Sequence, residues 1–537
     1  MDRQKEKNVE REKKKVMFVK PHLETDAVWD PIRTCPYIGA WYMTSGLKER
    51  GHDVKYLDEV TRNNGLENRT LFRRDMINGE TTETPVETSY EDFQAQKMAD
   101  YRSMTPESFV DKYSAFGEDG EISRTMVRTG NDLEDTLNDI GDMNPDVVGI
   151  PLIATANYIP ATKLGRAIKD RFPDVKVVFG GQHISADPEG FLRDNDYVDQ
   201  VVSGDAISAM TDIAEGRNND KIVYGGFRNF DEFPLLDPSI IEGNDYPDEP
   251  IHTYPTDGRK SVDYMFSKGC FRRCDFCVAG SQEGNHVTPI DYDMVDEQLR
   301  IFKKNGIEEL VIQDDAYLWD KNHVREHLPK LLGLMKKHGM YWQNNGGMEF
   351  EMMDDFVTEE ILKYNSSGEG RATSLYVPFN PRTWNKGQSV SGTMSERYHA
   401  NLDNLKKLKD AGVFVFTSGI IGTPEQTRET IDEDIEMNKK LIEEGYLSSA
   451  LSLSATMLPA TKWYDSNGHN IVDKEDYAGF SLFTTHHSTP HMSPRDIETS
   501  MIRWSQELDK VQTTYKWGTG FPSAENGSNQ DLKRGDE

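Results

Sequence analysis

Cysteine is scarce in this sequence, since 537 residues contain only four of them. They are Cys35, Cys270, Cys274 and Cys277. A secreted protein of this size that is stapled by disulfides normally carries more cysteines, at wider spacings. Three of the four lie within eight residues, which indicates metal or redox chemistry in a reducing environment. We therefore expect a cytoplasmic protein without a disulfide framework.

Long hydrophobic runs and positive charge are also lacking. The longest apolar candidate, residues 413–422, has about half of the roughly 20 residues that a membrane-spanning helix needs, so no transmembrane segment is expected. The N-terminal stretch MDRQKEKNVEREKKK is charged throughout and has no apolar core of a secretory signal. The 62 basic residues are outnumbered by 92 acidic ones, which gives a net charge of −30 and disfavours a nucleic-acid partner.

Short apolar strands alternate with helices over the first 210 residues, and a chain of this length is expected to form two or three domains. The strands are predicted at residues 16–19, 53–58, 146–153, 175–179 and 199–202. Strand and helix in alternation favour a parallel sheet, so residues 16–210 are predicted to form a doubly wound, Rossmann-like domain. Residues 1–15 are predicted to be a charged tail. The acidic stretch of about 61–140 shows no strong strand and is predicted to be an insertion or lid.

The carboxyl ends of these strands carry small and polar residues. Ligands of a parallel sheet bind at that edge, and small residues let a ligand approach the backbone closely. Two plainer interpretations stay open, since a Gly-Gly pair also suits an ordinary strand-to-helix turn and a histidine beside it also suits a helix cap. The residues at these ends are Pro21, Thr155, Gly180, Gly181, Gln182, His183 and Gly204.

A second α/β series follows a connector at 211–260 that is rich in Pro, Asp and Gly. Residues 261–460 are predicted to form six strand–helix units, which favours an α/β fold with a partial (β/α)6 TIM-type barrel. A small helical extension is predicted at 461–517, and residues 518–537 have a composition typical of disorder. The barrel strands are expected at 263–267, 309–313, 341–344, 374–379, 413–421 and 451–455.

The cysteine triplet follows the first of these strands as C-x-x-x-C-x-x-C. Three thiolates on one tight loop can hold three irons of a cubane iron–sulfur cluster, which leaves the fourth iron open for a substrate or cosubstrate. A structural zinc site needs a fourth ligand at short spacing, and the nearest histidines, His252 and His286, stand at unfamiliar offsets. Buried, inert thiols are the plainest alternative.

This loop resembles the signature of the radical S-adenosylmethionine (SAM) enzymes, C-x-x-x-C-x-aromatic-C on a partial barrel. The resemblance implies a [4Fe–4S] cluster on Cys270, Cys274 and Cys277, with SAM on the open iron and a 5′-deoxyadenosyl radical as product of SAM cleavage. Where relatives carry Glu-Ser at the fourth strand this chain has a different sequence, and Asn380 is expected to substitute there. The SAM contacts that the resemblance implies are Phe276, Gln313, Asp314, Asp315, Asn380, Gly419, Ile421 and Gly422.

The first 210 residues resemble the cobalamin-binding domains that precede the barrel in one class of radical SAM enzymes. The resemblance lies in the segments PDVVGI, VVFGGQH and VDQVVSGD and in their order. It implies that Pro21, Thr155, the 180–183 turn and Gly204 contact cobalamin. The motif D-x-H-x-x-G, whose histidine ligates cobalt in some cobalamin proteins, is absent.

The resemblance implies a cobalamin-dependent radical SAM enzyme, with methyl transfer to an unactivated carbon or phosphinate centre as the expected activity. It also implies a small-molecule or lipid-like substrate and an electron donor such as flavodoxin or ferredoxin, while no catalytic side chain is predicted. A cyclase, mutase or oxidoreductase of the same architecture that does not methylate is the alternative, and an iron–sulfur or zinc scaffold or sensor is a remote one. Methylthiolation and auxiliary clusters are disfavoured, since only Cys35 precedes the triplet and no cysteine follows it.

Overall fold

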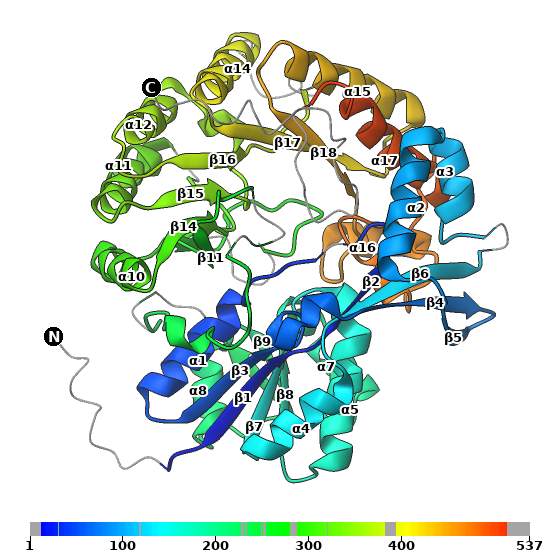
Figure 1. Ribbon diagram of the computed structural model, residues 1–537, viewed down its shortest axis with the longest axis vertical. Helices are drawn as coiled ribbons and strands as arrows, with labels where there is room; N and C mark the ends of the chain where they lie inside the picture. The colour runs from blue at the N-terminus through cyan, green and yellow to red at the C-terminus, as the bar shows by residue number, and fades with distance from the viewer. Residues whose placement is uncertain are drawn as a thin grey trace.

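The computed structural model describes residues 12–30, 32–117, 120–226, 230, 233–248, 250, 254–279, 287–318, 321–381 and 394–512. Two parallel sheets with their helices form the two halves of the molecule (Figure 1). Most of the predicted charged tail at 1–15 and all of the predicted disordered tail at 518–537 lie outside the described residues.

The first sheet is parallel and has six strands in the order β10-β9-β8-β7-β1-β3. The chain starts in β1, adds β3 on one side and then adds the remaining strands on the other, so the sheet is doubly wound with its switch point between β1 and β7. The predicted Rossmann-like fold is confirmed. The strands are β1 (Lys15–Lys20), β3 (Asp53–Asp58), β7 (Val147–Pro151), β8 (Lys176–Gly180), β9 (Gln200–Gly204) and β10 (Ile222–Gly225).

The connector begins later than the predicted residue 211, because strand β10 still belongs to the first sheet. The strand pairs in parallel with β9 and completes the first domain. Its four residues follow a polar stretch and expose Tyr224, so neither length nor alternation marks it in the sequence. The connector therefore begins after residue 225.

Helices cover both faces of this sheet, which explains why its strands are apolar on both sides. In β1, Val16 and Phe18 belong to the apolar cluster on the side of α1 and α8. Met17 and Val19 belong to the cluster on the side of α4 and α5. The helices are α1 (Ile38–Glu49), α4 (Leu133–Met143), α5 (Tyr158–Arg171), α6 (Gln182–Ala186), α7 (Pro188–Asp194) and α8 (Ala206–Ala214).

The predicted acidic insertion supplies three of the four strands of an antiparallel sheet, so the expectation that it holds no strong strand was wrong. The sheet has the order β2-β6-β4-β5 and two helices beside it. Its strands are hard to detect because buried charged side chains interrupt their apolar contacts, and because β5 is exposed throughout. The elements are β2 (Leu23–Asp26), β4 (Arg69–Ile77), β5 (Glu80–Pro85), β6 (Ile122–Thr129), α2 (Tyr90–Ser103) and α3 (Pro106–Tyr113).

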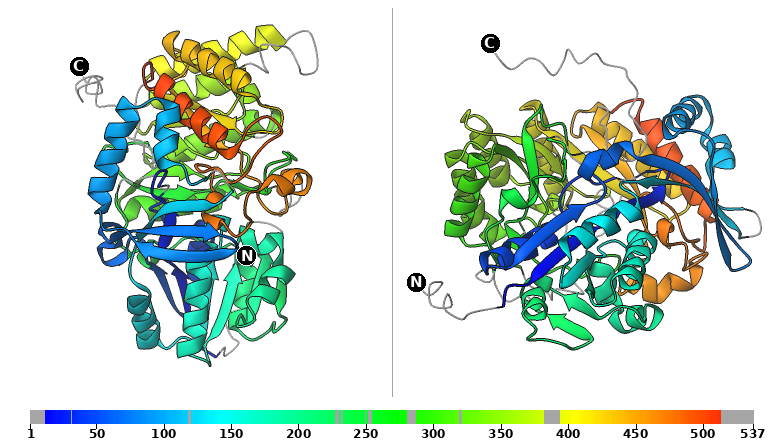
Figure 2. Two further views of the ribbon diagram at one scale, coloured as in Figure 1. Left: turned by 90° about the vertical axis from the view of Figure 1, so that its right-hand side faces the viewer. Right: turned by 60° about the horizontal axis from the view of Figure 1, so that its bottom comes forward.

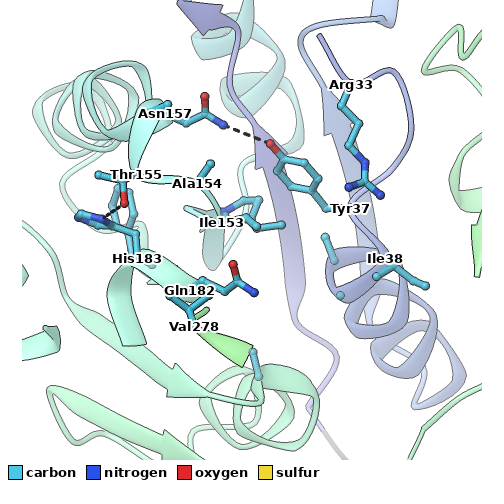
Figure 3. A pocket seen from close by; sticks show the side chains of 18 of the residues that line it. Arg33, Tyr37, Ile38, Ile153, Ala154, Thr155, Asn157, Gln182, His183 and Val278 are labelled. Carbon is cyan, nitrogen blue, oxygen red and sulfur yellow. Dashed lines mark hydrogen bonds between the residues drawn. The ribbon is translucent and has the colours of Figure 1, made fainter. Parts of the chain in front are cut away.

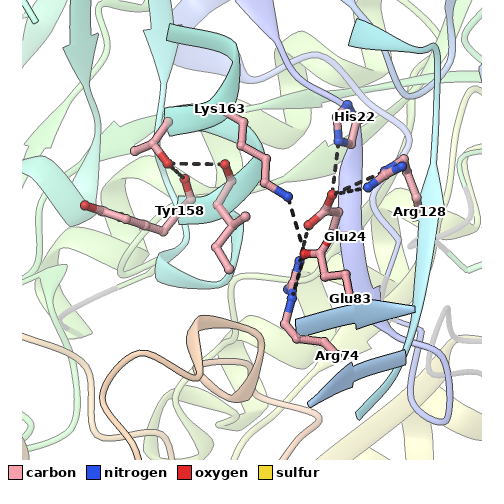
Figure 4. A network of polar contacts seen from close by, with 9 residues as sticks. His22, Glu24, Arg74, Glu83, Arg128, Tyr158 and Lys163 are labelled. Carbon is pink, nitrogen blue, oxygen red and sulfur yellow. Dashed lines mark hydrogen bonds and ion pairs between the residues drawn. The ribbon is translucent and has the colours of Figure 1, made fainter. Parts of the chain in front are cut away.

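Glu24 is the centre of one such network (Figure 4). Its carboxylate accepts hydrogen bonds from Arg74 at 2.5 Å and from Arg128 at 3.0 Å, and His22 lies 3.4 Å away. Burial opposes ionisation, but the hydrogen bond with His22 and the charge of Arg74 hold the pKa of Glu24 well below its usual range. A strand carrying these residues is stabilised by paired charges and shows no apolar alternation.

The second sheet is parallel, with six strands in the order β11-β14-β15-β16-β17-β18. Among the described residues no pairing joins β11 to β18, so the sheet is curved and open, and the predicted partial barrel is confirmed. The first strand lies three residues earlier than expected. The strands are β11 (Lys260–Tyr264), β14 (Ile307–Ile312), β15 (Tyr341–Asn344), β16 (Ala372–Tyr376), β17 (Phe414–Ile421) and β18 (Ser449–Ser454).

Helices line the outside of this sheet (Figure 1). The C-terminal extension then returns across the molecule, and α17 packs against β18, α15 and α3 of the insertion (Figure 2). No helix among the described residues is long and apolar enough to cross a membrane. The helices are α10 (Tyr292–Lys304), α11 (Lys321–Lys337), α12 (Asp355–Asn365), α14 (Met394–Asp410), α15 (Arg428–Glu443), α16 (Lys462–Asn467) and α17 (Pro494–Leu508).

Candidate functional site

A cavity of about 670 Å³ lies between the two parallel sheets. One wall consists of the turns after β7, β8 and β9, at the carboxyl edge of the first sheet. The barrel contributes residues that follow β11 and β14, together with Val278 just after the last cysteine of the triplet. A third wall comes from β2 and from residues 456–459 and 478–484. The cavity therefore borders both ligand-binding edges that the sequence predicts.

Two glycines shape the wall on the side of the first sheet. Gly181 has a φ of 114°, and a Cβ there would lie 2.5 Å from the carbonyl oxygen of Leu152. Gly204 has a φ of 88°, and a Cβ there would clash with the carbonyl of Gly225. Both positions need glycine because of backbone conformation and close packing. The backbone of both turns lines the cavity.

His183 projects from the same wall toward the cavity (Figure 3). Its Nδ1 lies 3.0 Å from the hydroxyl of Thr155, and the ring of Tyr158 meets it edge-on at 5.4 Å. Burial lowers the pKa of His183 to about 4, so the imidazole is neutral at neutral pH. Thr155, Gly180, Gly181, Gln182, His183 and Gly204 all line the cavity, whereas Pro21 is buried and does not line it.

The cysteine loop follows the short strand β12 (Ser267–Lys268) on the barrel side. Cys270 is buried, and Cys274 and Cys277 are exposed. Burial raises the pKa of the Cys270 and Cys274 thiols, and the charge of Cys277 raises both further. All three thiols stand on one short loop after β12. This donor set fits a cluster held by three thiolates.

No group of three or more His, Cys, Asp or Glu side chains in the described part of the chain gathers tightly enough around one point to hold a single metal ion. The two histidines weighed as zinc ligands, His252 and His286, lie outside the described residues.

Two neighbouring aspartates after β14 hold the loop in different ways. Asp314 is 1% exposed and accepts hydrogen bonds from the Phe266 amide at 2.8 Å and the Ser267 hydroxyl at 2.5 Å. Burial raises the pKa of Asp314 to about 7. Asp315 accepts the Gly269 amide at 3.1 Å and lines the cavity, as Gln313 does. Asp314 thus supports the strand before the cysteines and does not line the cavity.

The other residues predicted to contact SAM lie outside the cavity wall. Trp504 of α17 covers Gly419, where a Cβ would clash with the indole ring. The amide of Gly422 donates to the side chain of Gln426 at 2.8 Å, so Gln426 caps this turn. Ile421 is buried, Asn380 donates to Asp434 at 3.3 Å, and Phe276 remains 40% exposed.

Sequence reasoning missed the residues that close the cavity from the segment between β2 and α1. Arg33 and Tyr37 both line it, on the side opposite His183 (Figure 3). Arg33 forms an ion pair with Asp263 of β11, and the thiol of Cys35 donates to the same carboxylate at 2.8 Å. Burial raises the pKa of Cys35, so this cysteine is a neutral thiol. These residues stand in an irregular loop where no periodicity or spacing marks them.

A second ion pair crosses between the halves at the cavity wall. Lys268, two residues before Cys270, pairs with Asp205, which follows Gly204. The loop that carries the cysteines and the turn after β9 are therefore joined directly, at the place where both border the cavity.

Comparison with known proteins agrees with this arrangement. The B12 binding domain model matches residues 117–214, and the Radical SAM superfamily model matches residues 264–437. The first match covers β7, β8 and β9 of the first sheet, and the second covers most of the barrel. The chain therefore carries a B12 binding domain and a radical SAM domain. The radical SAM domain implies a [4Fe–4S] cluster and SAM, and the B12-binding domain implies cobalamin.

Several of the related proteins carry methyltransferase names. An uncharacterised methyltransferase of Pyrococcus horikoshii is 26% identical over 385 residues, which cover 65% of this chain and 78% of that protein. The cytidylyl-2-hydroxyethylphosphonate methyltransferase of Streptomyces wedmorensis is 26% identical over 292 residues, which cover 47% of this chain. The present chain spans 53% of the length of that second relative.

Among solved structures, the cobalamin-dependent SAM radical enzyme OxsB, with aqua-cobalamin and SAM bound, superposes with a TM-score of 0.52 at 11% identity. The match covers 96% of this chain and 64% of that one. At this identity the likeness shows the shared fold.

Proposed function

We propose that this radical SAM protein is a cobalamin-dependent methyltransferase that acts on a carbon or phosphorus atom of a small molecule. The observation that carries the proposal is the single cavity that borders both the B12-side turns and the cysteine loop. When bound, the cluster and SAM supply a radical that removes a hydrogen atom, and cobalamin supplies the methyl group. One shared cavity lets a substrate meet both groups without leaving the protein.

On the barrel side, Cys270, Cys274 and Cys277 hold the cluster in this proposal. Gln313 and Asp315 face the cavity beside the cysteine loop. Burial raises the pKa of Asp315, but the Gly269 amide opposes that shift by donating to the carboxylate. An ionised Asp315 would attract the ammonium group of SAM and orient the molecule before its cleavage.

On the B12 side, the turns at Gly181 and Gly204 line the part of the cavity where the corrin ring would lie. His183 stays neutral and is oriented by the Thr155 hydroxyl. Gln182 lies beside it on the same wall. These groups place the cofactor by contact and hydrogen bonding.

The third wall indicates the character of the substrate. Leu458, Phe480, Leu482 and Phe483 line it, and Leu482 is 50% exposed. The charged residues on this side are already paired, as Glu24 is with Arg74 and Arg128. We therefore propose a small molecule with a substantial apolar or lipid-like part. A flavodoxin or ferredoxin would supply the electron from the side where Cys274 and Cys277 are exposed.

The test is anaerobic reconstitution of the full chain with iron, sulfide and hydroxocobalamin, followed by a strong reductant and SAM. We expect bound corrin in the absorbance spectrum and the formation of both 5′-deoxyadenosine and S-adenosylhomocysteine. Cys274→Ala should abolish both products, whereas Cys35→Ser, the matched substitution outside the triplet, should keep the iron content of the wild type. Deoxyadenosine without bound corrin would instead favour an enzyme of this architecture that does not methylate.

A further inference from the structure

Besides the ion pair between Lys268 and Asp205, the cysteine loop has ties to the barrel and to the C-terminal extension. The first tie is the hydrogen bond from the Gly269 amide to Asp315, and the second is the ion pair between Arg272 and Glu349, with an N–O distance of 2.5 Å. Both come from the barrel. The third tie comes from α16 of the C-terminal extension, which is distant in sequence and reaches the loop between its last two cysteines.

The third tie centres on Trp463. Its amide donates to the carbonyl oxygen of Asp275 at 3.0 Å. Its indole ring lies 5.3 Å from the ring of Phe276, with an interplanar angle of 50°. Trp463 therefore contacts both residues that stand between Cys274 and Cys277, one through its backbone and the other through its side chain.

Lys462 adds an ion pair with Asp275 at 2.7 Å. Both side chains are more than half exposed, and exposed pairs of this kind contribute little to stability. The aromatic contact is the stronger of the two side-chain interactions, since an aromatic pair adds stabilisation beyond the area it buries.

Helix α16 is held in place by contacts within the C-terminal extension, so it can hold the cysteine loop in turn. The side chain of Thr461 caps α16 by accepting the Tyr464 amide, and its hydroxyl donates to the Leu458 carbonyl at 2.7 Å. Leu458 and Tyr464 pack against an apolar cluster of the extension that includes Met457 and Phe480. The same stretch, through Leu458 and Phe480, lines the cavity wall.

We propose that Trp463 is a positioning residue for the cluster. It holds the Asp275–Phe276 segment so that the exposed thiols of Cys274 and Cys277 keep the spacing that the cluster needs, and it fixes the Phe276 ring beside the SAM site. This inference rests on the proposed function of the cysteine loop and deepens it, because it gives a residue of the substrate-side extension a role at the metal centre.

The experiment compares reconstituted wild type with Trp463→Ala, Trp463→Phe and Tyr464→Ala in the full chain. Tyr464→Ala is the matched control, since it removes an aromatic ring from the same helix that packs on the extension. The readouts are iron and sulfide per chain, the half-life of cluster absorbance in air, and KM and kcat for SAM cleavage. Far-UV circular dichroism checks that each variant is folded.

For Trp463→Ala we expect iron uptake under anaerobic conditions similar to the wild type, but a cluster half-life in air that is shortened about two- to tenfold, the range that loss of one aromatic pair supports. We expect KM for SAM to rise by a similar factor while kcat stays within about twofold. Trp463→Phe should keep most of the wild-type cluster half-life and most of the wild-type affinity for SAM, since it retains an aromatic ring against Phe276.

Unchanged half-life and KM in Trp463→Ala, or the same losses in Tyr464→Ala, would overturn the inference while leaving the cluster assignment intact. If Trp463→Ala fails to fold, Trp463→Phe becomes the deciding variant. A folded Trp463→Phe whose cluster half-life falls twofold or more would contradict the role of the aromatic contact. A wild-type chain that takes up no iron would overturn the proposed function together with this inference.

Discussion

At the residue scale, neighbouring side chains with the same chemistry serve different purposes. Asp314 and Asp315 are adjacent and both follow β14, yet one supports the strand before the cysteines and the other faces the cavity. Asp314 accepts from Phe266 and Ser267, whereas Asp315, in the turn that follows, accepts from Gly269 at the cavity wall. Gly181 and Gly204 also line the cavity, but the backbone conformation and the close packing at each position already require glycine there.

Gly181→Ala tests this requirement. We expect it to destabilise the protein by about 2 kcal/mol, because the new Cβ occupies a strained backbone region and meets the Leu152 carbonyl. Hydroxocobalamin affinity should fall as well, as measured by titration of the corrin spectrum. Gly216→Ala is the control, since Gly216 has a φ of 70° but nothing within 4 Å of its added Cβ. Equal effects of the two substitutions on corrin affinity would refute a role for the 181 turn.

At the scale of elements, the antiparallel sheet of the insertion shows how buried charge replaces apolar packing. Arg124 of β6 is 1% exposed and lies between Asp26 of β2 and Asp476 of the C-terminal extension, at 2.8 and 2.6 Å. It also donates to the Thr485 carbonyl. A single arginine thus joins the insertion to the extension that forms the third wall of the cavity.

Arg124→Met should destabilise the protein by about 3–5 kcal/mol, because it leaves two buried carboxylates without their partner. Urea unfolding followed by far-UV circular dichroism measures the change. Arg166→Met removes an exposed partner of Asp196 and should cost less than about 1 kcal/mol. If both variants lose the same stability, the Arg124 network contributes no more than a surface ion pair.

At the scale of the whole molecule, the two halves share one apolar core. The cluster that covers one face of the first sheet continues into the barrel, where it includes Val262 and Leu310. Trp41 of α1 packs against Phe302 of α10 at 5.9 Å, and the side chain of Gln298 bonds the backbone of Leu236 at 2.7 and 3.1 Å. Such continuity predicts that the halves unfold together.

Phe302→Ala should lower stability by about 3–5 kcal/mol through the cavity it leaves. Because the core is shared, the urea midpoint for corrin release should fall together with the midpoint for loss of helix signal, although Phe302 belongs to the barrel. Lys303→Ala, at an exposed position of the same helix, should change both midpoints little. A corrin midpoint that stays at its wild-type value would show that the halves unfold independently.

The sequence by itself determined the features that depend on local pattern. Apolar runs with intervening helices located eleven of the twelve strands that the structure describes in the two parallel sheets, and the spacing of Cys270, Cys274 and Cys277 predicted a cluster loop. Turn residues such as Gly180 and Gly181 marked a ligand-binding edge because parallel strands bring their carboxyl ends to one side. Strand β10 and the strands of the insertion were missed, since a short strand or one with buried charges has no apolar period.

Only the tertiary structure decided which of these residues meet. Arg33, Asp205 and Lys268 reach the cavity from segments far apart in the chain, and Trp463 reaches the cysteine loop from almost 200 residues away. The glycines at 419 and 422, which fit a family pattern, are instead covered by α17. Local pattern encodes strands, turns and ligand types, but contact between distant segments depends on how complete elements pack, and that information is not carried by any one segment.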